Sequence, residues 1–100
     1  MIVDAWIQHP TPDFMAHPAF SSLLRWTSQE APSEEIPIDV TLAGMDQAGV
    51  AVSMLSAWHS PSGPMISNDQ VAAWCSAHPD RFAGLASFDL ARPMDAVREL

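Results

Sequence analysis

Three short apolar segments limit most strongly what this chain can fold into. They cover residues 2–8, 50–56 and 82–88. Each has the length of a strand rather than of a helix, and proline, serine or glycine follows within a few residues. We therefore predict three β-strands, of which the first is suited to burial on both faces, as in a parallel sheet. Strict alternation along the first strand would place Asp4, Trp6 and Gln8 on one face.

The intervals between these segments carry apolar residues at helical spacing. We predict helices over residues 18–27, 40–48, 68–78 and from 93 onward. Asp39 is suited to the N-cap of the second helix, and Gly49 is suited to its end. Ser67 and Gln70 have the spacing of a capping box. The predicted loops cover residues 28–38 and 57–64.

The resulting order, β-α-α-β-α-β-α, predicts an α/β fold in which parallel strands alternate with helices. Residues 1–100 form a single segment without an internal repeat. A closed eight-stranded barrel needs about 200 residues or more, so this segment would supply the N-terminal part of one. If the 100 residues are instead the whole molecule, the open sheet edges need a partner, and we expect a homo-oligomer.

Charge and cysteine content exclude several classes of function. The formal net charge is −8 and there is no lysine, so neither nucleic acid nor an anionic membrane is an expected partner. Without lysine this segment has no Schiff-base or phosphate-loop chemistry. The single cysteine, Cys75, excludes an internal disulfide and a cysteine-rich metal cluster. No apolar run has the ~18 residues of a membrane span, and no signal-peptide pattern is present, so we expect a cytoplasmic protein.

Three stretches of the sequence resemble one protein superfamily when they are taken in order. The first is Ile-Val-Asp-Ala-Trp-Ile-Gln at residues 2–8, and the second is Met-Asp-Gln-Ala-Gly-Val at residues 45–50. The third is Asn-Asp-Gln-Val at 68–71, continued by His-Pro-Asp-Arg-Phe-Ala-Gly-Leu-Ala at 78–86 and Arg-Pro at 92–93. In this combination the chain resembles the amidohydrolase superfamily, most closely the amidohydrolase-related branch that contains aminocarboxymuconate-semialdehyde decarboxylase. The likeness covers almost the whole chain.

The resemblance implies a metal-dependent hydrolase fold, a TIM-type (β/α)₈ barrel of which this chain is the N-terminal part. In that family two histidines on the first strand, with ligands from later strands, hold one or two divalent metals that activate water. The two histidine positions correspond to Trp6 and Gln8 in this sequence. Indole does not ligate a metal, and a carboxamide is a poor ligand for zinc. Two versions therefore stay open: a zinc-like divalent metal held mostly by residues beyond this chain with help from His9, or no cofactor.

The residues at the ends of the first two predicted strands are the candidate site residues. Active sites of this fold gather at the carboxyl ends of the strands. His9 and His59 are therefore candidate catalytic residues, because imidazole serves as an acid and a base near neutral pH. Trp6, Gln8 and Trp58 are candidate substrate-binding residues. The alternative for His9 is a loop histidine that bonds to the backbone, and the alternative for His59 is an exposed loop position.

The leading functional hypothesis is an amidohydrolase-like hydrolase that acts on a small carboxylated substrate. The first alternative is a metal-dependent decarboxylase, a carbon–carbon lyase of the same family. The second alternative is a non-catalytic interaction domain on a barrel scaffold that has lost its metal-binding histidines. The hydrolase and the decarboxylase both imply a small-molecule partner.

Overall fold

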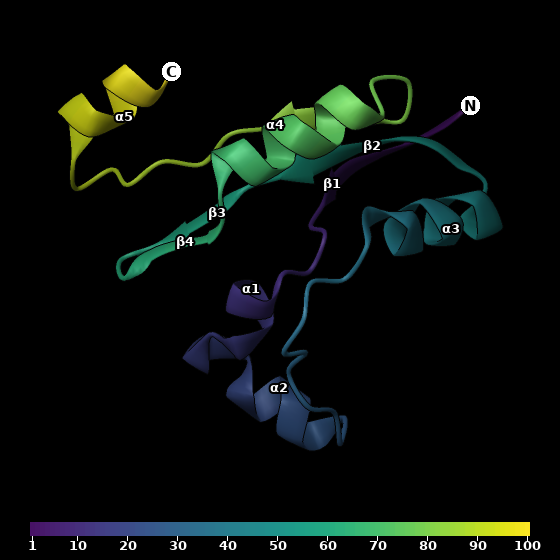
Figure 1. The fold of residues 1–100 in the computed structure, drawn as a ribbon, viewed down its shortest axis with the longest axis horizontal. Helices are drawn as coiled ribbons and strands as arrows, with labels where there is room; N and C mark the ends of the chain where they lie inside the picture. Colours follow the sequence, from purple (N-terminus) through teal and green to yellow (C-terminus); the bar gives the residue numbers. More distant parts are fainter.

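Three parallel strands form the sheet around which the chain is arranged (Figure 1). The computed structural model describes residues 1–100. The strands are β1 (Ile2–Ile7), β2 (Val50–Ser56) and β5 (Phe82–Leu85), in the sheet order β1-β2-β5. Both pairings are parallel, which confirms an α/β fold of parallel strands alternating with helices. The third strand ends at Leu85 rather than at residue 88.

Helices occupy most of the intervals between the strands. They are α3 (Ile38–Ala48) between β1 and β2, α4 (Asn68–Ala77) before β5, and α5 (Pro93–Glu99) after it. Gly49 ends α3 in the left-handed conformation, with a φ of 74°, as predicted. The capping box of Ser67 and Gln70 opens α4, also as predicted. None of the helices is long and apolar enough to cross a membrane.

Two local predictions are wrong. Asp39 is not the N-cap of α3, because Pro37 takes that position and Asp39 lies in the first turn. Proline has no backbone N–H, so it precedes a helix without loss, and the carboxylate interacts favourably with the positively polarised first turn. Residues 57–64, predicted to be a loop, contribute to an antiparallel hairpin of β3 (Trp58–Ser60) and β4 (Gly63–Ile66).

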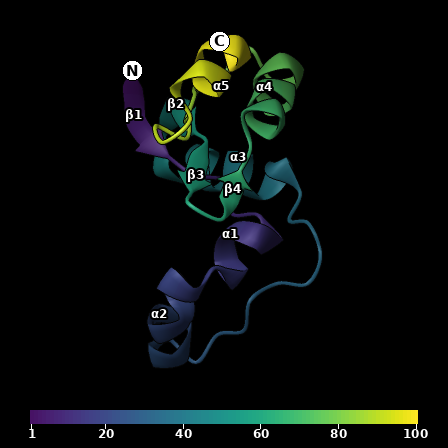
Figure 2. The ribbon, with the colours of Figure 1, turned by 90° about the vertical axis from the view of Figure 1, so that its left-hand side faces the viewer.

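The segment after β1 is more helical than the sequence predicts. Its helices are α1 (Pro12–Ala16), the 3-10 helix η1 (Pro18–Phe20) and α2 (Ser21–Trp26), in place of one helix over residues 18–27. The Thr11 hydroxyl accepts a hydrogen bond from the Phe14 backbone N–H at 3.1 Å and so caps α1. In both views α2 lies away from the sheet (Figure 1 and Figure 2). Residues 12–26 are called the arm below.

The buried core lies between the sheet and two helices. Ser53 and Phe82 are partners in the strand register, and Leu55 lies two residues along from Ser53, so the three share one face of the sheet. They are also the buried residues of the three strands. Met45 of α3 and Val71 of α4 belong to the same apolar cluster as Leu55 and Phe82. Both helices therefore cover the same face.

The opposite face of the sheet is open. Met54 and Ser56 of β2 are half-buried, and their partners in β5, Ala83 and Leu85, are exposed and half-buried. The Trp6 side chain of β1 is 60% exposed. No strand pairs with the outer edge of β1 or with that of β5. One face of the sheet is thus only partly covered, and neither outer edge has a partner strand.

The prediction that the first strand is buried on both faces is wrong. Ile2 is 56% exposed and Val3 is 49% exposed. The reason is the position of β1, which has a neighbouring strand on one side only. An apolar segment that reads as a central strand therefore forms an edge of this sheet.

A shift in register interrupts the alternation along β1. The shift lies between Asp4, which is paired with Ser53, and Ile7, which is paired with Leu55. Because Ser53 and Leu55 both face the helices, the predicted common face of Asp4 and Trp6 is wrong. The Asp4 carboxylate instead accepts a hydrogen bond from the Trp6 backbone N–H at 3.3 Å.

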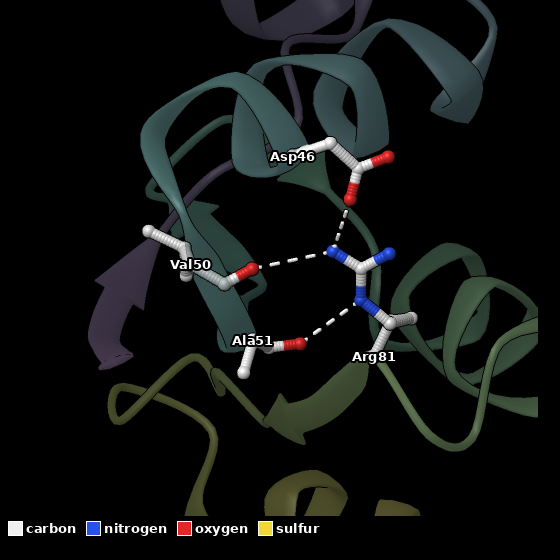
Figure 3. A network of polar contacts seen from close by, with 4 residues as sticks. All are labelled: Asp46, Val50, Ala51 and Arg81. Carbon is white, nitrogen blue, oxygen red and sulfur yellow. Dashed lines mark hydrogen bonds and ion pairs between the residues drawn. The ribbon is translucent and has the colours of Figure 1, made fainter. Parts of the chain in front are cut away.

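Arg81 joins the end of α3 to the strands. Its Nε donates to the Ala51 carbonyl oxygen at 2.9 Å (Figure 3). Its Nη2 donates to the Val50 carbonyl oxygen at 3.2 Å and to Asp46 Oδ1 at 2.7 Å (Figure 3). The guanidinium therefore binds two carbonyl oxygens and one carboxylate at the amino ends of β2 and β5, opposite to the carboxyl ends of the strands.

Candidate active site

The carboxyl ends of β1, β2 and β5 lie along one edge of the sheet, because the strands are parallel. This carboxyl edge is distinct from the two outer edges formed by β1 and β5. Ligands of parallel α/β folds bind at this edge. The segments that leave it begin at Gln8, Ala57 and Ala86. The predicted site residues lie within these segments, except for Trp6, which lies near the carboxyl end of β1. We therefore take this edge as the candidate site.

His59 lies between two hollows at this edge. It lines a hollow of about 330 Å³ together with Ser60 and Asp89, and a second hollow of about 190 Å³ together with Asp89 and Arg92. Asp89 belongs to the segment after β5, and Arg92 directly precedes α5. The fold thus brings an imidazole, a carboxylate and a guanidinium together from segments that are far apart in the sequence.

Further charged groups of α5 line the smaller hollow. Arg92 Nε lies 3.6 Å from Asp95 Oδ2, and the two side chains are 73% and 56% exposed. Glu99 lines the same hollow, and its Oε1 accepts a hydrogen bond from Asn68 Nδ2 at 2.9 Å. An ion pair as exposed as that of Arg92 contributes about 0–1 kcal/mol. The Arg92 guanidinium can therefore exchange Asp95 for a ligand carboxylate.

Hydrogen bonds fix the backbone on which His59 stands. The His59 N–H donates to Ser87 Oγ at 3.1 Å. Asn68 Nδ2 donates to the Ser87 carbonyl oxygen, and Asn68 Oδ1 accepts from the Ser87 N–H, both at 2.9 Å. The start of α4, the segment after β5 and the hairpin are therefore tied together at the candidate site.

An aromatic cluster and an unpartnered amide are found near the carboxyl ends of β1 and β2. The ring centroids of Trp6 and Trp58 are 6.1 Å apart, and Phe14 and Phe20 of the arm lie 5.5 and 6.3 Å from Trp58. Such rings offer a stacking wall to an apolar ligand group. Gln8 follows β1, and its Nε2 is buried without a hydrogen-bond partner. Buried amide donors are almost always paired, so a ligand oxygen would complete this one.

His9 lies among the helices rather than at the hollows. It is 1% exposed, and its ring packs edge-on against Trp74 of α4 at 4.8 Å between centroids. Its Nε2 lies 2.7 Å from the Ile36 carbonyl oxygen, and its Nδ1 lies 2.6 Å from Thr41 Oγ1. A carbonyl oxygen only accepts, so Nε2 carries a proton in this arrangement. Both ring nitrogens are therefore engaged, which favours a structural role for His9.

The residues of this chain do not form a metal site by themselves. No group of three or more His, Cys, Asp or Glu side chains is placed to hold a metal ion. The positions of the family's first-strand ligands carry the indole of Trp6 and the carboxamide of Gln8, and the His9 nitrogens are engaged elsewhere. Burial raises the pKa of the Cys75 thiol, which disfavours the thiolate that binds metals.

Sequence reasoning missed four residues of this site. They are Asn68, Ser87, Asp89 and Arg92. A positional signal was available for Asp89, because it follows the third strand as His59 follows the second. No local pattern could reveal the bonds between Asn68 and Ser87, since they join the beginning of a helix to a loop 19 residues away.

Comparison with known proteins assigns no family to the chain. No protein-family model matches it, and no curated protein matches it. The candidate site is therefore interpreted from its own geometry and from the sequence.

Proposed function

We propose that this chain forms the first part of an amidohydrolase-like (β/α)₈ barrel and that its carboxyl edge belongs to the active site of a hydrolase for small carboxylated substrates. One observation carries the proposal. His59 lines two hollows with Asp89, and the smaller one also with Arg92, at the edge where enzymes built on parallel strands place their catalytic groups.

The arrangement of the sheet supports the barrel. The order of the strands in the sheet follows their order in the chain, and α3 and α4 cover the same face. Right-handed connections give this one-sided arrangement when successive strands are added in one direction. The open face and the two free edges are the surfaces that further strands cover when such a sheet closes into a barrel.

His59 is the acid–base group of the proposed reaction. Its imidazole takes a proton from water while the water oxygen bonds to the carbonyl carbon of an amide substrate. The C–N bond then breaks, and the imidazolium returns the proton to the leaving nitrogen. The products are a carboxylic acid and an amine, so water is the only co-reactant. Asp89 lines both hollows with His59, so its carboxylate belongs to the same proposed site.

The other side chains at the edge bind the substrate in this proposal. Arg92 pairs with the substrate carboxylate, for which a guanidinium has matching geometry. The unpartnered Nε2 of Gln8 donates to a substrate oxygen. Trp6 and Trp58 contact the apolar part of the substrate, and the 60% exposure of Trp6 leaves its ring accessible. His9 stays in its structural position and takes no part in the reaction.

Two alternatives remain from the sequence. A decarboxylase would bind the same substrate carboxylate and release it as carbon dioxide, so the nature of the product separates it from the hydrolase. A non-catalytic interaction domain is favoured by the exposed apolar side chains of β1, Ile2, Val3 and Trp6. In that case His59 and Arg92 would have no chemical task.

Turnover of a substrate panel tests the proposal. N-acyl amino acids report hydrolysis by amine release, and aromatic dicarboxylic acids report decarboxylation by carbon dioxide release. We expect amine release that survives exhaustive chelation. His59→Ala should lower kcat about 100-fold or more, whereas His17→Ala, in the arm, should leave it unchanged. Arg92→Ala should raise KM about tenfold, and the exposed Arg25→Ala should not.

Each other outcome has a definite meaning. Carbon dioxide release would favour the metal-dependent decarboxylase. Amine release that is lost to a chelator and restored by zinc would favour a metal-dependent hydrolase. Absence of turnover over the whole panel, by a folded protein that carries the complete barrel, would favour the interaction domain. Equal turnover by His59→Ala and the unmodified chain would remove His59 from the mechanism.

A further inference from the structure

We infer that a cavity beside His9 is a second binding site, separate from the hollows at His59, and that it takes a small protonated aromatic amine. The cavity has a volume of about 240 Å³ and is called the His9 cavity below. It lies between the segment that follows β1, the segment that leads into α3, and α4. It shares no lining residue with the two hollows at His59, so the inference is independent of the proposed function.

Part of the wall of the His9 cavity is apolar and stiff. The apolar lining residues are Pro10, Pro12, Ile36, Pro37, Ile38 and Trp74. Proline rings have a fixed backbone φ, so these walls lose little conformational freedom when a ligand binds. The Trp74 ring is held by the edge-on contact with His9 at 4.8 Å. A cavity of this kind accepts a flat apolar group, and its volume holds one aromatic ring with a short substituent.

Among the side chains of the wall, the carboxylate of Glu35 is the charged group left free for a ligand. Both ring nitrogens of His9 are bonded to the chain. Thr11 Oγ1 donates to the Met65 carbonyl oxygen at 2.7 Å and accepts from a backbone N–H. Gln70 Oε1 accepts from the Ser67 N–H at 2.9 Å within the capping box. The Glu35 carboxylate lines the cavity, is exposed and has no ion pair, so it is free to bind a cation.

Charge in and around the His9 cavity favours a cation over an anion. No arginine lines it, and the chain has no lysine. The amino terminus of α3 borders the cavity and would by itself favour an anion. However, Glu35 precedes that terminus and Asp39 lies in its first turn, so two carboxylates offset its partial positive charge. An ammonium group on the ligand can pair with Glu35 and also approach the Trp74 ring.

Binding of three matched probes to the full chain tests this inference. Benzylamine carries the proposed positive charge, benzyl alcohol is its neutral counterpart, and benzoate is its anionic counterpart. Titrations followed by NMR report the position of binding through the Trp74 indole N–H, which is assigned by its loss in Trp74→Phe. We expect benzylamine to shift this resonance at the lowest concentration and benzoate at the highest.

A pair of neighbouring glutamates provides the matched variants. Glu35→Gln should weaken benzylamine about two- to fivefold, as expected for an exposed ion pair, and should leave benzyl alcohol unchanged. Glu34 is equally exposed but does not line the cavity, so Glu34→Gln should change neither affinity. Equal or tighter binding of benzoate would overturn the inference. Equal effects of the two variants, shifts confined to His59, or no shift with any probe would also overturn it.

Discussion

Single residues in equivalent sequence positions have different roles in this fold. His9 and His59 both follow a strand by two or three residues, and the sequence treats them alike. In the structure His9 is enclosed by Ile36, Thr41 and Trp74, whereas His59 lines two hollows. The course of the following segment decides the difference. After β1 the chain contacts α3 and α4 through His9, and after β2 it turns into a hairpin.

The buried position of His9 leads to a prediction about stability. His9→Ala leaves the Ile36 carbonyl oxygen and the Thr41 hydroxyl without their partner, so we expect the free energy of unfolding to fall by about 2–4 kcal/mol. His17→Ala is the control, because His17 accepts one local hydrogen bond in the arm. Urea denaturation measures both. A His9→Ala protein as stable as the His17→Ala protein would show that the two bonds of His9 contribute nothing.

The half-buried thiol of Cys75 leads to a prediction about pH. Burial raises its pKa, so at neutral pH the folded protein holds less thiolate than an exposed cysteine does. We expect iodoacetamide to alkylate the folded protein more slowly than the unfolded one, with the difference shrinking as pH rises. The stability that comes from the raised pKa is present below the ordinary thiol pKa and is lost as pH rises through the raised value. Equal rates in the two states would contradict the prediction.

At the scale of elements, side chains that hold backbone groups matter more than exposed ion pairs. Arg81 is 26% exposed and binds two carbonyl oxygens, whereas its carboxylate partner Asp46 is 64% exposed. Solvent screens an ion pair with so exposed a carboxylate. The carbonyl oxygens of Val50 and Ala51 lie at the start of β2, where their bonds to Arg81 link α3, β2 and β5.

A pair of substitutions separates the two contributions of Arg81. Arg81→Met removes the bonds to both carbonyl oxygens, and we expect it to lower the free energy of unfolding by about 1–3 kcal/mol. Asp46→Asn removes the charge of the exposed partner and should change it by less than about 1 kcal/mol. Denaturant unfolding of the two variants gives the comparison. A larger effect of Asp46→Asn would mean that the ion pair, not the backbone contact, stabilises this end of the sheet.

The contact between α4 and β5 depends on a missing side chain. A Cβ at Gly84 would lie 3.1 Å from Val71 Cγ1 and 3.5 Å from Cys75 Sγ. We expect Gly84→Ala to destabilise the chain by about 1–3 kcal/mol through overpacking. In a double-mutant cycle the Gly84→Ala, Val71→Ala protein should be more stable than the sum of the single effects predicts, because Val71→Ala removes the clashing methyl group.

Gly44 provides the matched control for this cycle. It lies within α3, and a Cβ there would have no atom within 4 Å. Gly44→Ala should therefore stabilise the chain by about 0.5–1 kcal/mol through helix propensity alone. If Gly84→Ala stabilised the chain as well, α4 would have more room against β5 than the contact with Val71 indicates.

The whole molecule presents a sheet that is covered on one face only. α3 and α4 lie over the core face, while the other face and the outer edges of β1 and β5 have no cover. Free edges of this kind invite pairing with another strand. In the proposed barrel the further strands belong to the same barrel. For the chain alone, we expect a second copy to supply them.

Self-association of the chain follows from its free edges. We expect sedimentation velocity to show association that increases with protein concentration. Val3→Lys places a charge on the β1 edge and should weaken it, since charged side chains protect strand edges. Val40→Lys, on an exposed part of α3, should not. A chain that stays monomeric at all concentrations would show that its edges do not pair.

Local sequence patterns are sufficient to predict the order and the type of the main elements. Alternation of apolar strands with amphipathic helices, the stop at Gly49 and the capping box at Ser67 act over a few residues, so a linear reading detects them. The tertiary structure alone decided the rest. The edge position of β1, the hydrogen bond from His9 to a threonine 32 residues away, and the shared hollows of Asp89 and His59 all depend on the packing of distant segments. No local pattern of residues encodes such contacts, because they exist only once the helices have packed on the sheet.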